Sequence, residues 1–202
     1  MIDASTIMKL RELTGAGIVE AKKALEAAGG DINKAIEALR KKGVVKAAEK
    51  GVRETREGRV HSYIHSNGKV GALLEVLCET DFVARNETFK ELCHDLAMQI
   101  AAANPLYVSS ADVPPEVVEK EKEVYSSGVE HSGKPAEIVN KIVEGKLAKY
   151  FSDVCLLNQT FIKDEDITVE ERIKAAIAKL GENIRVRRFV RFSLDQGEPQ
   201  VA

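Results

Sequence analysis

The chain of 202 residues contains no tryptophan, few other aromatic residues and only three cysteines, Cys78, Cys93 and Cys155. Three is an odd number, and no two of these cysteines have the C-x-x-C spacing of metal and redox motifs. A disulfide framework is therefore not expected. We interpret the cysteines as small buried apolar residues in a protein of a reducing compartment.

The sequence also lacks long apolar runs and an excess of basic residues. No segment approaches the ~20 consecutive apolar residues of a membrane helix, and the first five residues resemble neither a secretory signal nor a transit peptide. The net charge is −2, whereas proteins that bind nucleic acid mainly through its phosphates are usually basic. These features predict a cytoplasmic protein without a membrane anchor, and they favour a protein partner over a nucleic acid.

Motifs for catalysis and phosphate binding are missing as well. No G-x-x-x-x-G-K-[ST] sequence is present, and the glycine-rich residues 14–17 follow a predicted helix rather than a strand. His61 and His65 share one face of a predicted strand but have no evident third metal ligand. Neither His94 nor His131 fits a Ser-His-Asp or Cys-His order. We therefore expect no enzyme active site, no metal site and no cofactor.

Residues 1–43 have the pattern of three short helices separated by glycine-containing turns. Gly43 stands where a helix C-terminus favours glycine. The expected inner faces comprise Ile7, Leu10 and Leu13, then Ile18, Ala21, Ala24 and Leu25, then Ile32, Ala35, Ile36 and Leu39. Residues 44–58 mix both charge signs with little apolar pattern, which predicts a solvated linker at a domain boundary.

Residues 59–194 combine strand and helix patterns. Asn67-Gly68 between two strand-like runs indicates a hairpin with a type I′ turn. The expected elements are strands over 60–65, 70–78 and 183–194, and helices over 86–103, after Pro114-Pro115, after Lys134-Pro135 and from Thr168 to Leu180. The fold class is therefore α+β, with a helical N-terminal module and a small antiparallel sheet covered by helices. Residues 195–202 are expected to form a flexible tail.

The terminal strand combines basic and aromatic side chains. They are Arg185, Arg187, Arg188, Arg191, Phe189 and Phe192. Strand alternation places Phe189 on the arginine side and Phe192 on the apolar side. Such a face can bind phosphate and stack on bases. A solvated strand face, on which arginine discourages edge pairing, explains the same pattern, as does a protein interface.

The segment Glu79-Thr80-Asp81-Phe82-Val83-Ala84-Arg85-Asn86 connects the second strand to the long helix. Connections of this kind lie on the surface and often carry function. An acidic residue beside a large aromatic one at the tip is suited to binding a partner. The alternative explanation is structural, with Asp81 capping a turn and Phe82 folding back onto the core.

Several segments resemble the elongation factor Ts family, and they occur in family order. They are residues 10–18 with 22–25, 78–86, 133–135, 142–147 and 181–184 with Arg187 and Arg188. The resemblance covers essentially the whole chain. It is closest to the short bacterial form of the family, which lacks the duplicated core subdomain, the inserted coiled coil and the C-terminal module of the longer form.

The resemblance implies a guanine nucleotide exchange factor for elongation factor Tu, with an N-terminal module that is similar to a ubiquitin-associated fold and docks on the GTPase. Thr80, Asp81, Phe82 and Val83 would intrude near the Mg²⁺ of the partner's nucleotide. The implied docking residues are Arg11, Gly15, Gly17, Ile18, Val19 and Lys22. Short members of the family pair two copies through their sheets. A homodimer is therefore expected, through the terminal strand or the polar face of residues 60–65.

Three other functions remain open on the residues alone. An adaptor that binds protein through residues 1–43 predicts that this module suffices for the whole activity. An RNA-binding protein that uses the arginine strand predicts steep salt dependence, which the acidic composition disfavours. An enzyme is the third, and no assembled site for it is visible.

Overall fold

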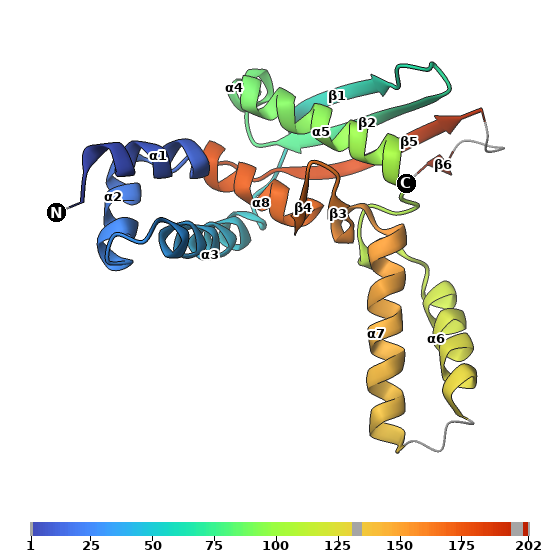
Figure 1. Cartoon of the computed structure of the whole chain (residues 1–202). Helices are drawn as coiled ribbons and strands as arrows, with labels where there is room; N and C mark the ends of the chain where they lie inside the picture. The colour runs from blue at the N-terminus through green and yellow to red at the C-terminus, as the bar shows by residue number, and fades with distance from the viewer. Residues whose placement is uncertain (1, 131–134, 195–199, 202) are drawn as a thin grey trace. The chain divides into compact units, whose positions relative to one another are not determined.

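The computed structural model describes residues 2–130, 135–194 and 200–201 (Figure 1). The helices are α1 (Ala4–Thr14), α2 (Ile18–Ala27), α3 (Ile32–Lys50), α4 (Asp81–Arg85), α5 (Glu87–Ala103), α6 (Pro115–Glu130), α7 (Ala136–Val154) and α8 (Val169–Leu180), with 3₁₀ turns η1 (Ser110–Asp112) and η2 (Leu156–Asn158). The strands are β1 (Glu57–Ile64), β2 (Val70–Cys78), β3 (Thr160–Phe161), β4 (Asp164–Thr168), β5 (Arg185–Ser193) and β6 (Gln200–Val201). The predicted α+β class is confirmed. His131 and residues 133–134 lie outside the described residues.

The chain divides into two compact units, each built from separate stretches of sequence. Unit 1 comprises Met1–Gly58, Leu77–Leu92 and Glu171–Arg185, and unit 2 comprises Arg59–Val76, Cys93–Glu170 and Val186–Ala202. The helical N-terminus therefore shares a unit with segments from the middle and the end of the chain. The division into a module over 1–43, a linker over 44–58 and a core over 59–194 stays a prediction.

Helices α1, α2 and α3 enclose a small core in unit 1. Leu10, Ala21, Leu25 and Ala35 are fully buried, and seven partly buried apolar side chains pack against them. The predicted inner faces are thus largely confirmed, except for Leu13 and Ile18. These two side chains are exposed because they flank the turn between α1 and α2, where the periodic pattern continues but the neighbouring helices do not cover it.

Helix α3 continues through Gly43 to Lys50, so the prediction that Gly43 ends the helix is wrong. Ala47, one turn further on, is buried. A Cβ atom on Gly43 would lie 3.3 Å from the Cβ of Ala178 in α8, also in unit 1. Gly43 therefore permits a close approach of two helices. The mixed charges that suggested a linker fit the exposed face of a helix equally well.

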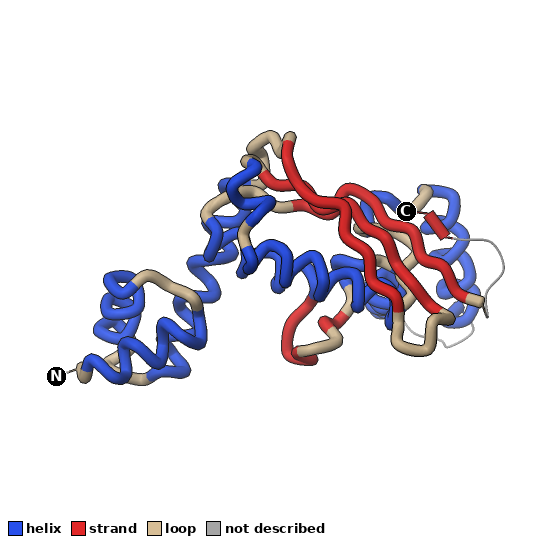
Figure 2. The backbone as a smooth tube through the Cα atoms, turned by 90° about the horizontal axis from the view of Figure 1, so that it is seen from above, coloured by secondary structure: helices blue, strands red, loops and turns tan. Residues whose placement is uncertain are grey.

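Strands β1, β2, β5 and β6 form one sheet in that order. Ala72, Leu74 and Val76 of β2 are buried, and α5 runs along the sheet (Figure 2). The opposite face of β2 contains the exposed Leu73. Most of the predicted flexible tail lies outside the described residues, but β6 pairs antiparallel with β5, opposite Val190 and Arg191.

Strands β1 and β2 form the predicted hairpin, but its turn is not type I′. That type requires positive φ at both central residues, and here Gly68 has a φ of 68° while Asn67 does not have a positive φ. The Gly68 amide donates to the His65 carbonyl at 2.8 Å. The Asn67 side chain accepts from the Lys69 amide at 2.9 Å. Asparagine thus stabilises the turn through its side chain rather than through a left-handed backbone.

Strand β5 departs from the predicted alternation. Val186 and Phe189 are both buried although they are three residues apart, whereas a regular strand would point them to opposite faces. Arg187 and Arg188 lie between them and are both exposed. This is the pattern of a β-bulge, in which one extra residue is inserted into the strand. The prediction that Phe189 lies on the arginine side is therefore wrong.

Helices α6 and α7 pack against each other as a hairpin in unit 2 (Figure 1). Val143 is buried, while Val124 and Ile138 remain exposed, and the ammonium of Lys146 lies 5.6 Å from the centre of the Tyr125 ring. This pairing of the two helices was not predicted from the sequence. Across the described residues, no helix combines the length and apolar character needed to span a membrane.

Candidate protein-interaction site

The connection between β2 and α5 presents Phe82 to solvent. Its side chain is 81% exposed, so the alternative in which Phe82 folds back onto the core is wrong. Transfer of such a ring from water into an apolar pocket of a partner would contribute roughly 2–3 kcal/mol. Residues 80–83, called the Phe82 segment below, therefore have a side chain suited to binding another protein.

The conformation of the Phe82 segment comes from the short helix α4. Thr80 is the N-cap, with an extended backbone and a hydroxyl oxygen that accepts from the Val83 amide at 3.5 Å. Asp81 is thus the first helical residue and not the cap, which corrects the structural alternative. Ala84 is buried on the inner side of this helix. The cap and this one buried residue orient α4 so that Phe82 faces outward.

Asp81 forms an ion pair with Arg85 at 3.0 Å, one helical turn further on. Both side chains are well exposed, at 45% for Asp81 and 79% for Arg85. An exposed pair of this kind contributes little to stability. The Asp81 carboxylate can therefore exchange Arg85 for another partner at low cost.

A carboxylate from the far end of the chain underlies the Phe82 segment. Glu182 follows α8 and accepts through one oxygen from the amides of Glu79 and Thr80, at 3.1 and 3.0 Å. Its other oxygen accepts from the Thr80 hydroxyl at 2.6 Å. Reasoning from the sequence did not assign Glu182 to the site. The only signal was its place in the segment 181–184 that resembles the family.

Asn183 extends this network to the residues after α3, still within unit 1. Its amide donates to a carboxylate oxygen of Glu79 at 2.6 Å, and its side-chain amide donates to the carbonyls of Gly51 and Arg53, at 3.3 and 2.7 Å. The Arg53 guanidinium lies 3.6 Å from Glu79. Asn183 is buried, and a buried amide with its donors satisfied holds these segments at fixed distances.

Cys78 precedes the Phe82 segment and is fully buried. Its thiol donates to the Thr80 carbonyl at 3.2 Å. Burial, together with the charge of Glu182, raises the pKa of Cys78 to about 11, so the group is a neutral thiol at physiological pH. All three cysteines are free and buried, which confirms their interpretation as small buried residues.

The docking residues implied for the N-terminal module gather at the turn between α1 and α2. Ile18 and Val19 are 54% and 67% exposed, and Arg11 and Lys22 are exposed as well. Gly15 ends α1 with a φ of 68° and donates to the Arg11 carbonyl, while Gly17 is the N-cap of α2. Leu13, 61% exposed, joins this set although the sequence pattern assigned it to the core. We call Leu13, Ile18 and Val19 the docking turn.

The arginine strand does not present a free basic face. Arg187 and Arg188 each donate to one oxygen of Glu75, at 2.9 and 2.8 Å, and together they hold the pKa of Glu75 below its usual range. Arg191 donates to the Ala101 carbonyl, and Phe189 is buried. These internal contacts weaken the interpretation of β5 as an RNA-binding strand.

Two histidines from different elements of unit 2 come together. His61 Nε2 of β1 lies 3.3 Å from His94 Nδ1 of α5, and the Tyr63 ring lies edge-on to His94. Burial, followed by the charge of His94, lowers the pKa of His61. Within the described residues, no group of three or more His, Cys, Asp or Glu side chains is arranged to hold a metal ion.

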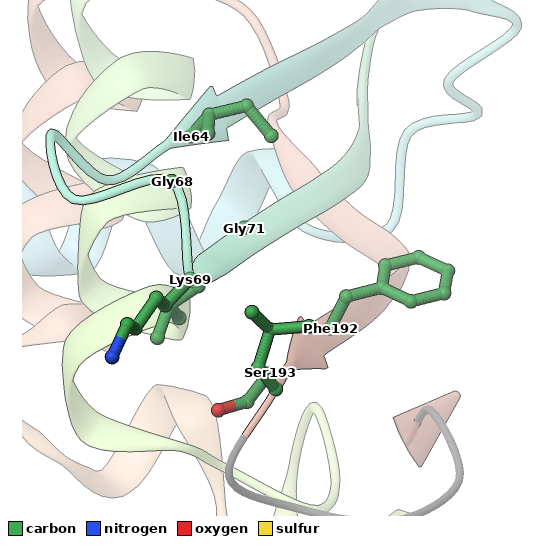
Figure 3. Close-up of a pocket in the computed structure, with 8 residues that line it drawn as sticks. Ile64, Gly68, Lys69, Gly71, Phe192 and Ser193 are labelled. Carbon is green, nitrogen blue, oxygen red and sulfur yellow. The ribbon is translucent and has the colours of Figure 1, made fainter.

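The sheet face opposite α5 carries exposed apolar side chains. They are Val60, Ile64, Leu73, Phe192 and Leu194, which we call the open sheet face. A recess of about 300 Å³ lies between the end of the hairpin and the end of β5, lined in part by Ile64 and Phe192 (Figure 3). A Cβ on Gly71 would lie 2.7 Å from Ile64 Cδ1, so a larger residue at this position would require the exposed Ile64 side chain to move.

The described residues thus form an α+β protein with exposed apolar groups on the short helix α4, on the turn between two helices and on a sheet face, each suited to contact with another protein. The profile of the family Elongation factor TS matches residues 5–176. The chain belongs to the elongation factor Ts family, as the resemblance predicted.

Relatives match the chain over nearly its full length. It is 56% identical over 196 residues to elongation factor Ts of Thermotoga petrophila, covering 97% of this chain and 98% of that protein. It is 55% identical over 196 residues to that of Thermosipho melanesiensis, covering 97% and 100%. It is 54% identical over 197 residues to that of Carboxydothermus hydrogenoformans, covering 98% and 91%.

Proposed function

We propose that this protein is a cytoplasmic guanine nucleotide exchange factor that promotes GDP release from elongation factor Tu during translation. The observation that carries the proposal is the display of Phe82, which is 81% exposed on a segment anchored by Glu182. Membership of the elongation factor Ts family supports the identity of the partner.

Exchange follows from the effect of the Phe82 segment on the partner's Mg²⁺. That ion bridges nucleotide phosphates and protein oxygens, so any shift of its ligands weakens nucleotide binding. Phe82 enters an apolar pocket of the GTPase as a wedge. Asp81 then leaves its exposed ion pair with Arg85 and disturbs the surroundings of the metal through its charge and hydrogen bonds. Thr80 and Val83 hold the segment in place.

The N-terminal module supplies a second contact with the GTPase. The docking turn presents apolar side chains, with Arg11, Gly15, Gly17 and Lys22 around it. Docking by this module raises the effective concentration of the Phe82 segment at the nucleotide site. A weak wedge can then act without needing high affinity of its own.

Thermodynamic linkage sets one requirement on this mechanism. If the protein lowers the affinity of the GTPase for GDP, then GDP lowers the affinity of the GTPase for this protein by the same factor. A tight complex with the empty GTPase and a loose one with the loaded GTPase are both necessary. Exchange therefore passes through a transient ternary complex.

The open sheet face is the contact surface of a homodimer in this proposal. Its apolar side chains are exposed in the single chain, and two copies that face each other would cover them. Glu75 binds both Arg187 and Arg188 and so offsets one of their two positive charges. This lowers the repulsion between two identical surfaces that face each other. It differs from the two surfaces first expected. Phe189 of the terminal strand is buried, and His61, on the polar face of residues 60–65, contacts His94 of α5.

The test is stopped-flow release of a fluorescent GDP analogue from elongation factor Tu. We expect strong acceleration by the wild-type protein, a large loss for Phe82→Ala and partial recovery for Phe82→Leu, which keeps an apolar side chain. Val124→Ala is the matched control, because Val124 is an exposed apolar residue of α6 in unit 2. No acceleration by the wild type would overturn the proposal and favour an adaptor that binds through residues 1–43.

A further inference from the structure

We propose that Glu182 is a positioning residue that fixes the Phe82 segment and, with Asn183, couples it to the end of helix α3. The inference rests on the proposed function only for the meaning of the Phe82 display.

Helix α4 cannot hold its own geometry. It has five residues, and helices this short are not stable in isolation because forming the first turn is unfavourable. Its position must come from tertiary anchors. The carboxylate of Glu182 provides three, since it accepts from two backbone amides and one hydroxyl directly before α4. Bonds to an ionised acceptor are stronger than those between neutral groups.

The carboxylate also orients the N-cap. A carboxylate only accepts hydrogen bonds, so the single proton of the Thr80 hydroxyl must point to Glu182 at 2.6 Å. The lone pairs of the Thr80 hydroxyl oxygen are then available to accept from the Val83 amide. Loss of the carboxylate would free the hydroxyl to rotate and would weaken the cap. This proton therefore adds to the anchors that orient Phe82, two residues after the cap.

Asn183 and Glu79 transmit the same geometry to the N-terminal helices. Asn183 joins the carbonyls of Gly51 and Arg53, just after α3, to its own backbone beside Glu182. The backbone amide of Asn183 donates to the carboxylate of Glu79, which directly precedes Thr80. One set of hydrogen bonds thus connects the residues that follow α3 to the residue that directly precedes the Phe82 segment. Because the docking turn and the Phe82 segment are held in place before binding, less conformational entropy is lost when both contact the GTPase.

A purely structural role for Glu182 makes a different prediction. If Glu182 only supported the fold, its loss would reduce exchange by the same factor whether or not Phe82 is present. If it acts through Phe82, its loss has little further effect once the ring is gone. A double-mutant cycle separates the two cases because it measures coupling between the residues.

The experiment compares exchange on elongation factor Tu by the wild type, Glu182→Ala, Glu182→Gln, Phe82→Ala and the Glu182→Ala/Phe82→Ala double variant. We expect Glu182→Ala to lower the exchange efficiency roughly tenfold, as expected for the loss of hydrogen bonds to a charged acceptor. Glu182→Gln should recover part of this, because an amide oxygen still accepts from both backbone amides. The matched control is Glu165→Ala, which removes an equal charge from an exposed residue of β4.

A second measurement does not depend on activity. Hydrogen exchange of the peptide that covers residues 79–85 should speed up in Glu182→Ala and stay unchanged in Glu165→Ala. If Glu182→Ala fails to fold, Glu182→Gln and Thr80→Val replace it. Both variants should speed up hydrogen exchange of the peptide that covers residues 79–85. Unchanged protection in these variants would overturn the inference.

The outcomes separate this inference from the proposed function. A wild-type protein that does not accelerate GDP release would overturn the proposed function, while hydrogen exchange would still report on the anchor. Acceleration by Glu182→Ala equal to that by Glu165→Ala would overturn the positioning role alone. So would an equal loss from Glu182→Ala with and without Phe82. A loss confined to the background that contains Phe82 would support the positioning role.

Discussion

Gly43 of α3 faces Ala178 of α8 so closely that a Cβ atom on the glycine would lie 3.3 Å from the Cβ of the alanine. Both residues belong to unit 1. Helix α8 ends at Leu180, directly before Gly181, Glu182 and Asn183. The third helix of the N-terminal module therefore packs on the helix that leads to the anchor of the Phe82 segment.

This close approach predicts that Gly43→Leu destabilises the protein by about 1–3 kcal/mol, as expected for an overpacked contact. The clash outweighs the gain of ~1 kcal/mol that leucine brings to a helix interior relative to glycine. Gly145 of α7 is the matched control, because nothing lies within 4 Å of a Cβ placed there, and Gly145→Leu should stabilise. Thermal unfolding followed by circular dichroism checks both. A similar change in both variants would contradict the close-packing argument.

The docking turn predicts a loss of partner affinity without a loss of fold. Leu13→Asp and Ile18→Asp should each weaken binding to nucleotide-free elongation factor Tu by about tenfold or more, in the range of central interface residues. Val45→Asp is the control, because Val45 is 59% exposed, close to the 61% of Leu13, and lies on α3 rather than at the turn. Isothermal titration calorimetry gives the affinities. If Leu13→Asp binds like the control, Leu13 does not belong to the docking surface.

The open sheet face predicts that Phe192→Arg yields a monomer. A charged side chain at the centre of an apolar contact leaves a buried charge unpaired, which opposes association. Val124→Arg is the control, since Val124 and Phe192 are each 56% exposed but Val124 lies on α6. Light scattering across a range of concentrations gives the mass of each variant. A monomeric wild-type protein at every concentration would rule out the dimer itself.

The buried thiols predict alkaline sensitivity. Burial raises the pKa of Cys78 and of Cys155 to about 11, from 9.0 for an ordinary thiol. Between these two values the unfolded chain loses protons that the folded chain keeps, so stability falls as the pH rises and is fully present below 9.0. Urea unfolding should therefore give a lower free energy of unfolding in this pH window, and Cys78→Ala should make that free energy depend less steeply on pH. If the free energy of unfolding of Cys78→Ala depends on pH as steeply as that of the wild type, Cys78 titrates normally in the folded protein.

Thiol labelling with a chromogenic disulfide reagent below pH 9.0 checks that the cysteines are buried in the folded protein. The native protein should resist the reagent because all three cysteines are buried, and the denatured protein should react at each of them. Rapid labelling of the native protein would mean that the region around Cys78 opens readily, which would also conflict with a preset Phe82 segment.

The sequence by itself determined the elements that depend on local patterns. The positions of most helices and the β1–β2 hairpin follow from periodicity and turn residues. The segment around Phe82 could be singled out for the same reason, since an acidic residue and an aromatic one together in a surface connection are visible in the chain. Periodicity shows which residues share a face, because side-chain direction repeats along a helix or strand.

Only the tertiary structure decided which of those faces are covered. Leu13 continues an apolar pattern yet is exposed, and Gly43 has the position of a helix end yet lies inside α3. The anchor of the Phe82 segment joins Thr80 to Glu182 across 102 residues. No local pattern reports such a contact, because a carboxylate and a hydroxyl are common surface groups until the fold brings them within hydrogen-bond distance.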